Sequence, residues 1–243
     1  MAYSAPHAVR EYLAAACLGI SHQYVVHCQR RTSGDKRRIL LDLREIDLCA
    51  LIARFFGASG HLAAQGVAAE NAADIEVDGP TIRAEVKYFR PSGTSKGQTQ
   101  ARAWGQLDGD WKWLLSATNN GGEFGKRAWV VFWPSISIFR FTHCLSVPKS
   151  HGAQYCRADF APFVPYAVPE LPANGVNQRL VFRAEPDRTS VIQIPNGKRV
   201  RCDLIGYAEH PIWAAVYTRI TPAEADSLSG LPVHVADNAR ITI

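Results

Sequence analysis

The stretch that most constrains the fold is residues 71–90, which form the pattern of two short strands joined by a tight turn. Polar and apolar residues alternate on both sides of an Asp-Gly-Pro break at residues 78–80, as expected for a β-hairpin with one buried face. A four-residue loop would set Val77 opposite Ile82 and Asp74 opposite Glu85. A loop of another length would shift this register, so the pairing depends on the turn.

The polar face of this hairpin brings two carboxylates together. Asp74 and Glu85 share that face with Lys87, because alternate side chains of a strand point the same way. Carboxylates that oppose each other destabilise a sheet, but a divalent cation between them reverses the sign, since hard cations take oxygen ligands. The pattern therefore predicts a metal site with Lys87 beside it. The alternative is a surface hairpin with a salt-bridged outer face.

Asp74, followed by Glu85, Val86 and Lys87, resembles the motif of the PD-(D/E)xK phosphodiesterase superfamily, the core shared by many restriction and repair nucleases. The resemblance implies an α/β fold with a restriction-endonuclease-like core, in which helices flank a mixed central sheet. It also implies Mg²⁺, or Mn²⁺ in its place, held by Asp74, Glu85 and the carbonyl of Val86, with Lys87 assisting the attacking water. Ala73 departs from the pattern, because the family's name has a proline there.

A long helix is predicted over Leu40–Phe56, with Gly57 as its terminator. Glu45 projects from the apolar stripe of this helix, and a core-facing carboxylate is costly unless it is paired or binds a metal. Family members often carry a glutamate on the helix before the sheet, so the resemblance implies that Glu45 points at the active site and holds a second metal or a water. The alternative is a partly exposed glutamate paired with Arg44 or Arg38.

A second helix is predicted over residues 98–117, although the glycines at 105 and 109 weaken it and residues 107–110 could instead form a turn. Many family members have a glutamine on the helix after the lysine strand. Gln98, Gln100 and Gln106 compete for that role, and Gln106 is favoured. A buried strand then follows at residues 128–133, so that the resemblance covers about residues 40–133.

Three regions are predicted along the chain. The nuclease core with its N-terminal helices spans residues 1–145, a proline-rich connection spans residues 146–174, and a β-rich C-terminal module spans residues 175–243. Strands are expected in the module at residues 179–183, 189–194, 198–205 and 212–220, followed by a short helix capped by Thr221. This module would either read DNA or another partner, or brace the core.

The charge of the chain suits a polyanionic partner. The net charge is +5, and the densest basic cluster comes just before the first long apolar helix. This cluster and Lys96 are the predicted DNA-phosphate contacts, and a solvated basic loop is the alternative. The predicted contacts are Arg30, Arg31, Lys36, Arg37, Arg38 and Lys96.

The six cysteines are scattered and include no C-x-x-C pair, which favours a reduced, cytoplasmic protein. A cluster of His143, Cys144, His151 and Cys156 offers zinc-ligand chemistry, but its spacing fits no common zinc finger. Apolar runs fall short of the ~20 residues of a membrane span, so no membrane partner is predicted.

These observations together favour a Mg²⁺-dependent endonuclease that hydrolyses DNA phosphodiester bonds, of the restriction or repair type. Cutting both strands would call for a homodimer, since one site cuts one strand. Two alternatives remain open: a non-catalytic nucleic-acid-binding protein on the same fold, and an antibacterial nuclease toxin with the same chemistry.

Overall fold

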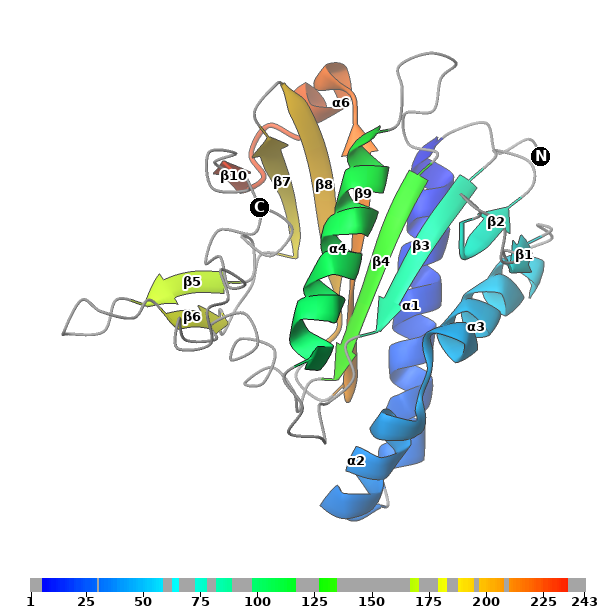
Figure 1. Ribbon diagram of the computed structural model, residues 1–243. Coiled ribbons are helices and arrows are strands. Elements are labelled where there is room, and N and C mark those ends of the chain that lie inside the picture. The colour runs from blue at the N-terminus through cyan, green and yellow to red at the C-terminus, as the bar shows by residue number, and fades with distance from the viewer. Residues whose placement is uncertain are drawn as a thin grey trace.

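The computed structural model describes residues 6–29, 31–58, 63–65, 73–77, 82–88, 98–116, 127–134, 167–170, 179–182, 188–194, 197–207 and 210–235. Within these residues one eight-stranded mixed sheet has the order β1-β2-β3-β4-β9-β8-β7-β10 (Figure 1). Its strands are β1 (Ala63–Gln65), β2 (Ile75–Val77), β3 (Ile82–Tyr88), β4 (Arg127–Pro134), β7 (Thr189–Ile194), β8 (Lys198–Ile205), β9 (Ile212–Ile220) and β10 (Val233–Val235). The predicted α/β class is confirmed.

Helices cover both faces of this sheet. In Figure 1, α4 (Gln98–Ser116) lies in front of the sheet, while α1 (Pro6–Cys28) lies behind it and α3 (Glu45–Ala58) lies beside β2 and β3. α1 is one of the N-terminal helices expected in this region, and it runs without a break for 23 residues.

The long helix predicted over Leu40–Phe56 is wrong in its bounds, because the chain breaks it into α2 (Ser33–Asp42) and α3. Leu43 caps α2 in an extended conformation. Asp47 then accepts a hydrogen bond from the backbone N–H of Arg44 (3.0 Å), a side-chain cap that starts a new helix. As a result Glu45 lies in the first turn of α3 and not in a helix interior.

The basic stretch after Arg30 is not the loop that was given as the alternative for it, because residues 33–42 form a helix. Thr32 is the N-cap of α2, and its hydroxyl accepts a hydrogen bond from the backbone N–H of Asp35. The Ser-Gly-Asp sequence at residues 33–35 is therefore the first turn of a helix, which Lys36 and Arg38 continue.

The hairpin register is confirmed from Ile75 to Val77, but the strand pairing ends there and does not include the predicted pair of Asp74 and Glu85. Ile75 pairs with Ala84 and Val77 with Ile82, and the strands are antiparallel. All four of these side chains are buried, as is Val86. A further short strand, β1, pairs with the other edge of β2. The connecting turn at residues 78–81 lies outside the described residues.

β3, α4 and β4 form a crossover unit in which the two strands are parallel neighbours. The helix passes through residues 107–110, so the alternative turn there is wrong. Three apolar side chains at helical spacing, Leu107, Trp111 and Leu114, are buried against the sheet. Their burial outweighs the weak helix propensity of Gly109.

The C-terminal strands continue the sheet of the predicted core. β9 pairs antiparallel with β4, and β8 and β7 follow outward as an antiparallel pair. The sheet therefore crosses the predicted boundary between the core and the C-terminal module. Of the two roles left open for this module, the continuous sheet supports bracing of the core. α6 (Pro222–Ser227) begins at the predicted cap, Thr221. A separate two-stranded sheet joins β5 (Ala167–Glu170) to β6 (Arg179–Phe182).

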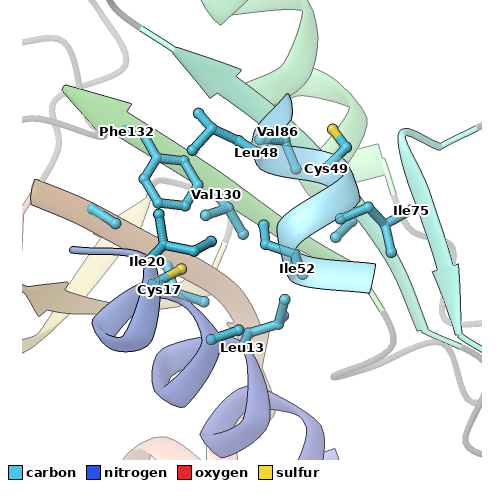
Figure 2. Packing of buried hydrophobic residues seen from close by; sticks show 14 of the residues in the cluster. Leu13, Cys17, Ile20, Leu48, Cys49, Ile52, Ile75, Val86, Val130 and Phe132 are labelled. Carbon is cyan, nitrogen blue, oxygen red and sulfur yellow. The ribbon is translucent and has the colours of Figure 1, made fainter. Parts of the chain in front are cut away.

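Two apolar clusters fill the two sides of the sheet. On the α1 and α3 side, Figure 2 shows Ile20 and Ile52 beside Val130 and Phe132 of β4, with Val86 of β3 close by. On the α4 side, Trp129 and Trp133 of β4 are fully buried. Consecutive residues of β4 are thus buried on both faces, as are those of its neighbour β9, so these two strands form the centre of the sheet.

Several predicted features lie outside the described residues. They are Arg30, Lys96 and the cluster of His143, Cys144, His151 and Cys156. In the part of the chain that the structure describes, no helix is both long and apolar enough to cross a membrane.

Candidate metal and catalytic site

The candidate site lies where β3 outruns its partner β2. The described pairing of the two strands ends at Ile75 and Ala84, whereas β3 continues beside β4 to Tyr88. The stretch from Glu85 to Tyr88 thus has β4 on one edge, and carboxylates meet it on the other. Glu85 and Lys87 are half-buried, and they alternate with the buried side chains of the α3 side.

On this edge of β3, two carboxylates accept the backbone hydrogen bonds that the carbonyls of a neighbouring strand would otherwise accept. Asp74 Oδ2 accepts a hydrogen bond from the N–H of Val86 (2.8 Å), and Glu45 Oε2 accepts one from the N–H of Tyr88 (3.2 Å). The N–H and C=O of one strand residue face the same edge. The carbonyl of Val86 therefore faces the Asp74 side, as a metal ligand at this site would require.

Asp74 and Glu85 lie close enough for their charges to interact. The pKa of Glu85 is raised to about 8. Burial is the main cause, and the negative charges of Asp74 and Asp110 add to it, while Lys87 opposes it. Without another cation, the carboxyl of Glu85 thus keeps its proton at neutral pH.

The donor set fits a hard cation. Within the described residues, no three His, Cys, Asp or Glu side chains already stand in the arrangement of a metal-binding group. Asp74 and Glu85 nevertheless offer two adjacent carboxylates, and Val86 offers a carbonyl oxygen. Mg²⁺ typically takes one or two protein carboxylates and fills its other positions with water and substrate phosphate. A cation that replaces the proton of Glu85 would also remove the repulsion between the carboxylates of Asp74 and Glu85.

Lys87 lies within a ring of acids. Its Nζ is 3.6 Å from Asp110 Oδ2 and 3.7 Å from Glu45 Oε2, and its side chain is 19% exposed. Burial by itself lowers the pKa of this lysine, but the charges of Asp110, Glu45, Asp74 and Glu85 outweigh burial and raise it. Lys87 is therefore a cation at neutral pH in the structure described.

Asp110 is the site residue that sequence reasoning missed. Burial raises its pKa to about 6, Lys87 counteracts this rise, and the charges of Asp74 and Glu45 add to it. The signal was present, because Asp110 lies three residues after Leu107 and four before Leu114, on the buried stripe of α4. The adjacent Gly109 instead suggested a turn.

Glu45 reaches the site, as the resemblance implied. The alternative pairing with Arg44 is not formed, because Arg44 binds Asp47 (3.1 Å). Gln106 lies on α4 four residues before Asp110, but its side chain lies outside the described part. Of the predicted carboxylate and lysine residues, the structure thus brings Asp74, Glu85, Lys87 and Glu45 together.

The basic helix α2 adjoins the end of the strand that carries the site. The hydroxyl of Tyr88 donates a hydrogen bond to the carbonyl of Leu40 (2.8 Å), which ties the last turn of α2 to the end of β3. Arg31 and Arg38 are exposed and Lys36 is half-buried, while the side chain of Arg37 is not described. Figure 1 shows α2 beyond the arrowhead of β3, at the same end of the molecule.

Comparison with protein-family models, curated proteins and solved structures finds no match to this chain. The functional interpretation therefore depends on the geometry of the site.

Proposed function

We propose that the protein is a Mg²⁺-dependent endonuclease, of restriction or repair type, that hydrolyses DNA phosphodiester bonds on a restriction-endonuclease-like core. One observation carries the proposal: Asp74, Glu85 and Lys87 converge at the edge of β3, where Asp74 is fixed to the backbone of Val86. A surface hairpin would leave these side chains exposed, but here Glu85 and Lys87 are half-buried among further acids.

The order of the elements supports the same core. An antiparallel pair, β2 and β3, is followed by a crossover helix, α4, and a strand parallel to β3. The helix that precedes the sheet, α3, supplies Glu45 to the site. These are the parts that the superfamily resemblance implies, in the expected sequence.

Each residue has a defined part in the proposed reaction. Asp74, Glu85 and the carbonyl of Val86 would hold the cation. When bound, Mg²⁺ would polarise a phosphoryl oxygen and acidify a nucleophilic water. Lys87 would place its positive charge beside the phosphoryl group and stabilise the negative charge that develops in the transition state. Glu45 would fix the edge of β3 through Tyr88 and orient Lys87.

The basic surface supplies the substrate contacts of the proposal. DNA affinity arises mainly from neutralised phosphates, and α2 presents Lys36 and Arg38 next to the end of β3, with Arg31 just before the helix. Duplex DNA bound along α2 would pass the open edge that holds Asp74 and Glu85. A homodimer would supply the second site that double-strand cleavage needs.

A cleavage assay tests the proposal. Supercoiled plasmid, single-stranded DNA and RNA are incubated with the protein in Mg²⁺, in Mn²⁺ and in EDTA. We expect nicking of DNA with either metal and none with EDTA. Asp74→Asn should abolish it, while Glu76→Gln should cleave like the wild type. The control is matched, because Glu76 is an acid of the same hairpin that lies away from the site and pairs with Arg83 (3.1 Å), with 44% of its side chain exposed.

Other outcomes of this assay, or of expression in cells, point to other functions. Tight DNA binding without nicking in any metal would contradict the endonuclease and favour the non-catalytic binding protein. Cleavage of RNA alone would remove DNA as the substrate. Toxicity on expression that a neighbouring gene suppresses would identify an antibacterial nuclease toxin with the same chemistry.

A further inference from the structure

The ammonium of Lys87 is held from two sides. Asp110 approaches it from α4, on one face of the sheet, and Glu45 approaches from the start of α3, which covers the other. The two carboxylate oxygens lie at nearly equal distances from Nζ, 3.6 and 3.7 Å. These separations are ion pairs and not short hydrogen bonds, so the ammonium keeps donors for a further partner.

Asp110 has features that an ordinary helix carboxylate lacks. Its side chain is 16% exposed, and among the described residues its Oδ2 accepts no hydrogen bond. A buried carboxylate is costly unless a charge compensates it, and among the described residues the cation nearest to Oδ2 is Lys87. The side chain of Trp129 also acts on this carboxyl and lowers its pKa. Asp108, two residues earlier, is equally buried, with 13% of its side chain exposed, but it pairs with the exposed Lys112 of its own helix (2.6 Å).

We propose that Asp110 is a positioning residue for Lys87, which holds the lysine ammonium over the open edge of β3 for phosphodiester cleavage. This inference rests on the proposed nuclease function. A lysine has a flexible four-carbon stem and three rotatable donors, so its charge is placed only as well as its neighbours fix it. Two carboxylates on opposite sides, one on α3 and one on α4, restrict that charge before substrate binds. Electrostatic stabilisation of a transition state is strongest when the charge is placed in advance.

The first test removes the charge of Asp110 and keeps the shape of its side chain. We expect Asp110→Asn to lower the single-turnover cleavage rate by ~10-fold or more, with Asp110→Glu recovering part of the loss. The rise in thermal midpoint that Mg²⁺ causes should be retained, since Asp74 and Glu85 are untouched. Asp108→Asn removes the same charge from the same helix and should cleave normally. Loss of the metal response in Asp110→Asn would overturn the positioning role.

The second test separates positioning from general damage. If Asp110 acts through Lys87, then Asp110→Asn should cause no further loss of rate in a Lys87→Ala background. A residue with a merely structural role would lower the rate by the same factor in both backgrounds. Independent, multiplicative losses would therefore overturn the inference.

A third measurement does not depend on cleavage. It therefore tests the pairing of Lys87 with Asp110 separately from the proposed nuclease function. Thermal midpoints are measured for Lys87→Met, Asp110→Asn and the double variant without metal. If the ion pair holds, the double variant loses less than the sum of the single losses, because each change alone leaves one buried charge uncompensated. Additive losses would overturn the Lys87–Asp110 pairing. A wild type that nicks no DNA, but shows this coupling, would overturn only the nuclease function.

Discussion

At the residue scale, Glu85 determines the electrostatic state of the site. Burial and the charge of Asp74 raise its pKa to about 8, so the folded protein retains a proton that an exposed glutamate would lose. A divalent cation and this proton compete for the same oxygens. Metal binding, proton release and stability are therefore linked at one pair of side chains.

The first prediction follows from the repulsion between these two acids. Mg²⁺ or Mn²⁺ should raise the thermal midpoint of the wild type, since a ligand that binds only the folded state stabilises it. Asp74→Asn should remove most of that rise. Glu76→Gln is the control and should keep it. Differential scanning fluorimetry with a metal titration measures both. An equal metal response in Asp74→Asn would place the cation elsewhere.

The second prediction concerns pH. Because the pKa of Glu85 is raised on folding, its neutral form stabilises the metal-free protein below about pH 4.5, and this contribution is lost as pH rises towards 8. Glu85→Gln stays neutral, so its midpoint should match the wild type near pH 5 and exceed it by a few degrees at pH 9. The raised pKa of Asp110 makes stability depend on pH with the same sign in the wild type and in Glu85→Gln, so the difference between their midpoints reports on Glu85. A midpoint difference that does not change with pH would contradict this assignment.

The third prediction separates catalysis from binding at Lys87. Lys87→Ala should fold, because its neighbours Val86 and Tyr88 keep their places in the core. DNA affinity should drop by about one phosphate contact, whereas single-turnover cleavage should fall by ~10² or more. Lys112→Ala, which removes an exposed lysine from α4, is the matched control. If affinity and cleavage fall in parallel, Lys87 is a phosphate clamp and not a catalytic residue.

Most of this site could be predicted from sequence because its residues are local to one hairpin. Strict alternation fixed which side chains share a face, and the register of Ile75 with Ala84 follows from the loop length. Asp110 could not be placed in this way. Its role depends on how α4 packs across β3, and a strand-by-strand reading contains no information on that contact.

At the element scale, the break between α2 and α3 determines where Glu45 points. Apolar residues continue at helical spacing from Leu40 to Phe56, so periodicity predicted one helix. The signal that ends α2 and starts α3 is a pair of short-range hydrogen bonds around Arg44 and Asp47. Because the helix restarts there, Glu45 lies at its first turn and reaches the backbone of Tyr88.

A fourth prediction tests whether α2 is the DNA-binding element. Thr32→Ala removes its N-cap, which should lower the free energy of unfolding by ~1 kcal/mol and weaken DNA binding, because the basic side chains depend on this helix. Thr221→Ala removes the equivalent cap of α6 and should cost similar stability without changing DNA affinity. Chemical denaturation and salt-controlled binding titrations measure the two effects. Equal DNA affinities in the two variants would exclude α2 from the interface.

At the scale of the whole molecule, the sheet unites parts of the chain that sequence reasoning divided. The pairing of β4 with β9 is non-local, and each strand alone is equally compatible with a separate module. The bounds of β7, β8 and β9 were predicted because each is a continuous apolar or alternating run. Which strand would lie beside β4 was not encoded in any local pattern.

The fifth prediction addresses this unity directly. A chain that ends at Ala173 lacks β7, β8 and β9, and so leaves the buried strand β4 without its neighbour. We expect this truncated protein to show no cooperative thermal transition and no cleavage. Circular dichroism on heating measures the first property. A truncated protein that melts cooperatively would instead show that the C-terminal strands are dispensable for folding.

The central place of β4 also has a consequence for how the protein is made. A ribosome completes β4 long before β9, since residues 135–211 are synthesised in between. Until then the nascent chain exposes an apolar strand with an unfilled edge, a state that is prone to aggregate. The candidate site lies on β3, which β4 holds in place, so we expect the site to form only when the distant strand arrives. On the proposed nuclease function, products that terminate before β9 would then not cleave the DNA of the cell that makes them.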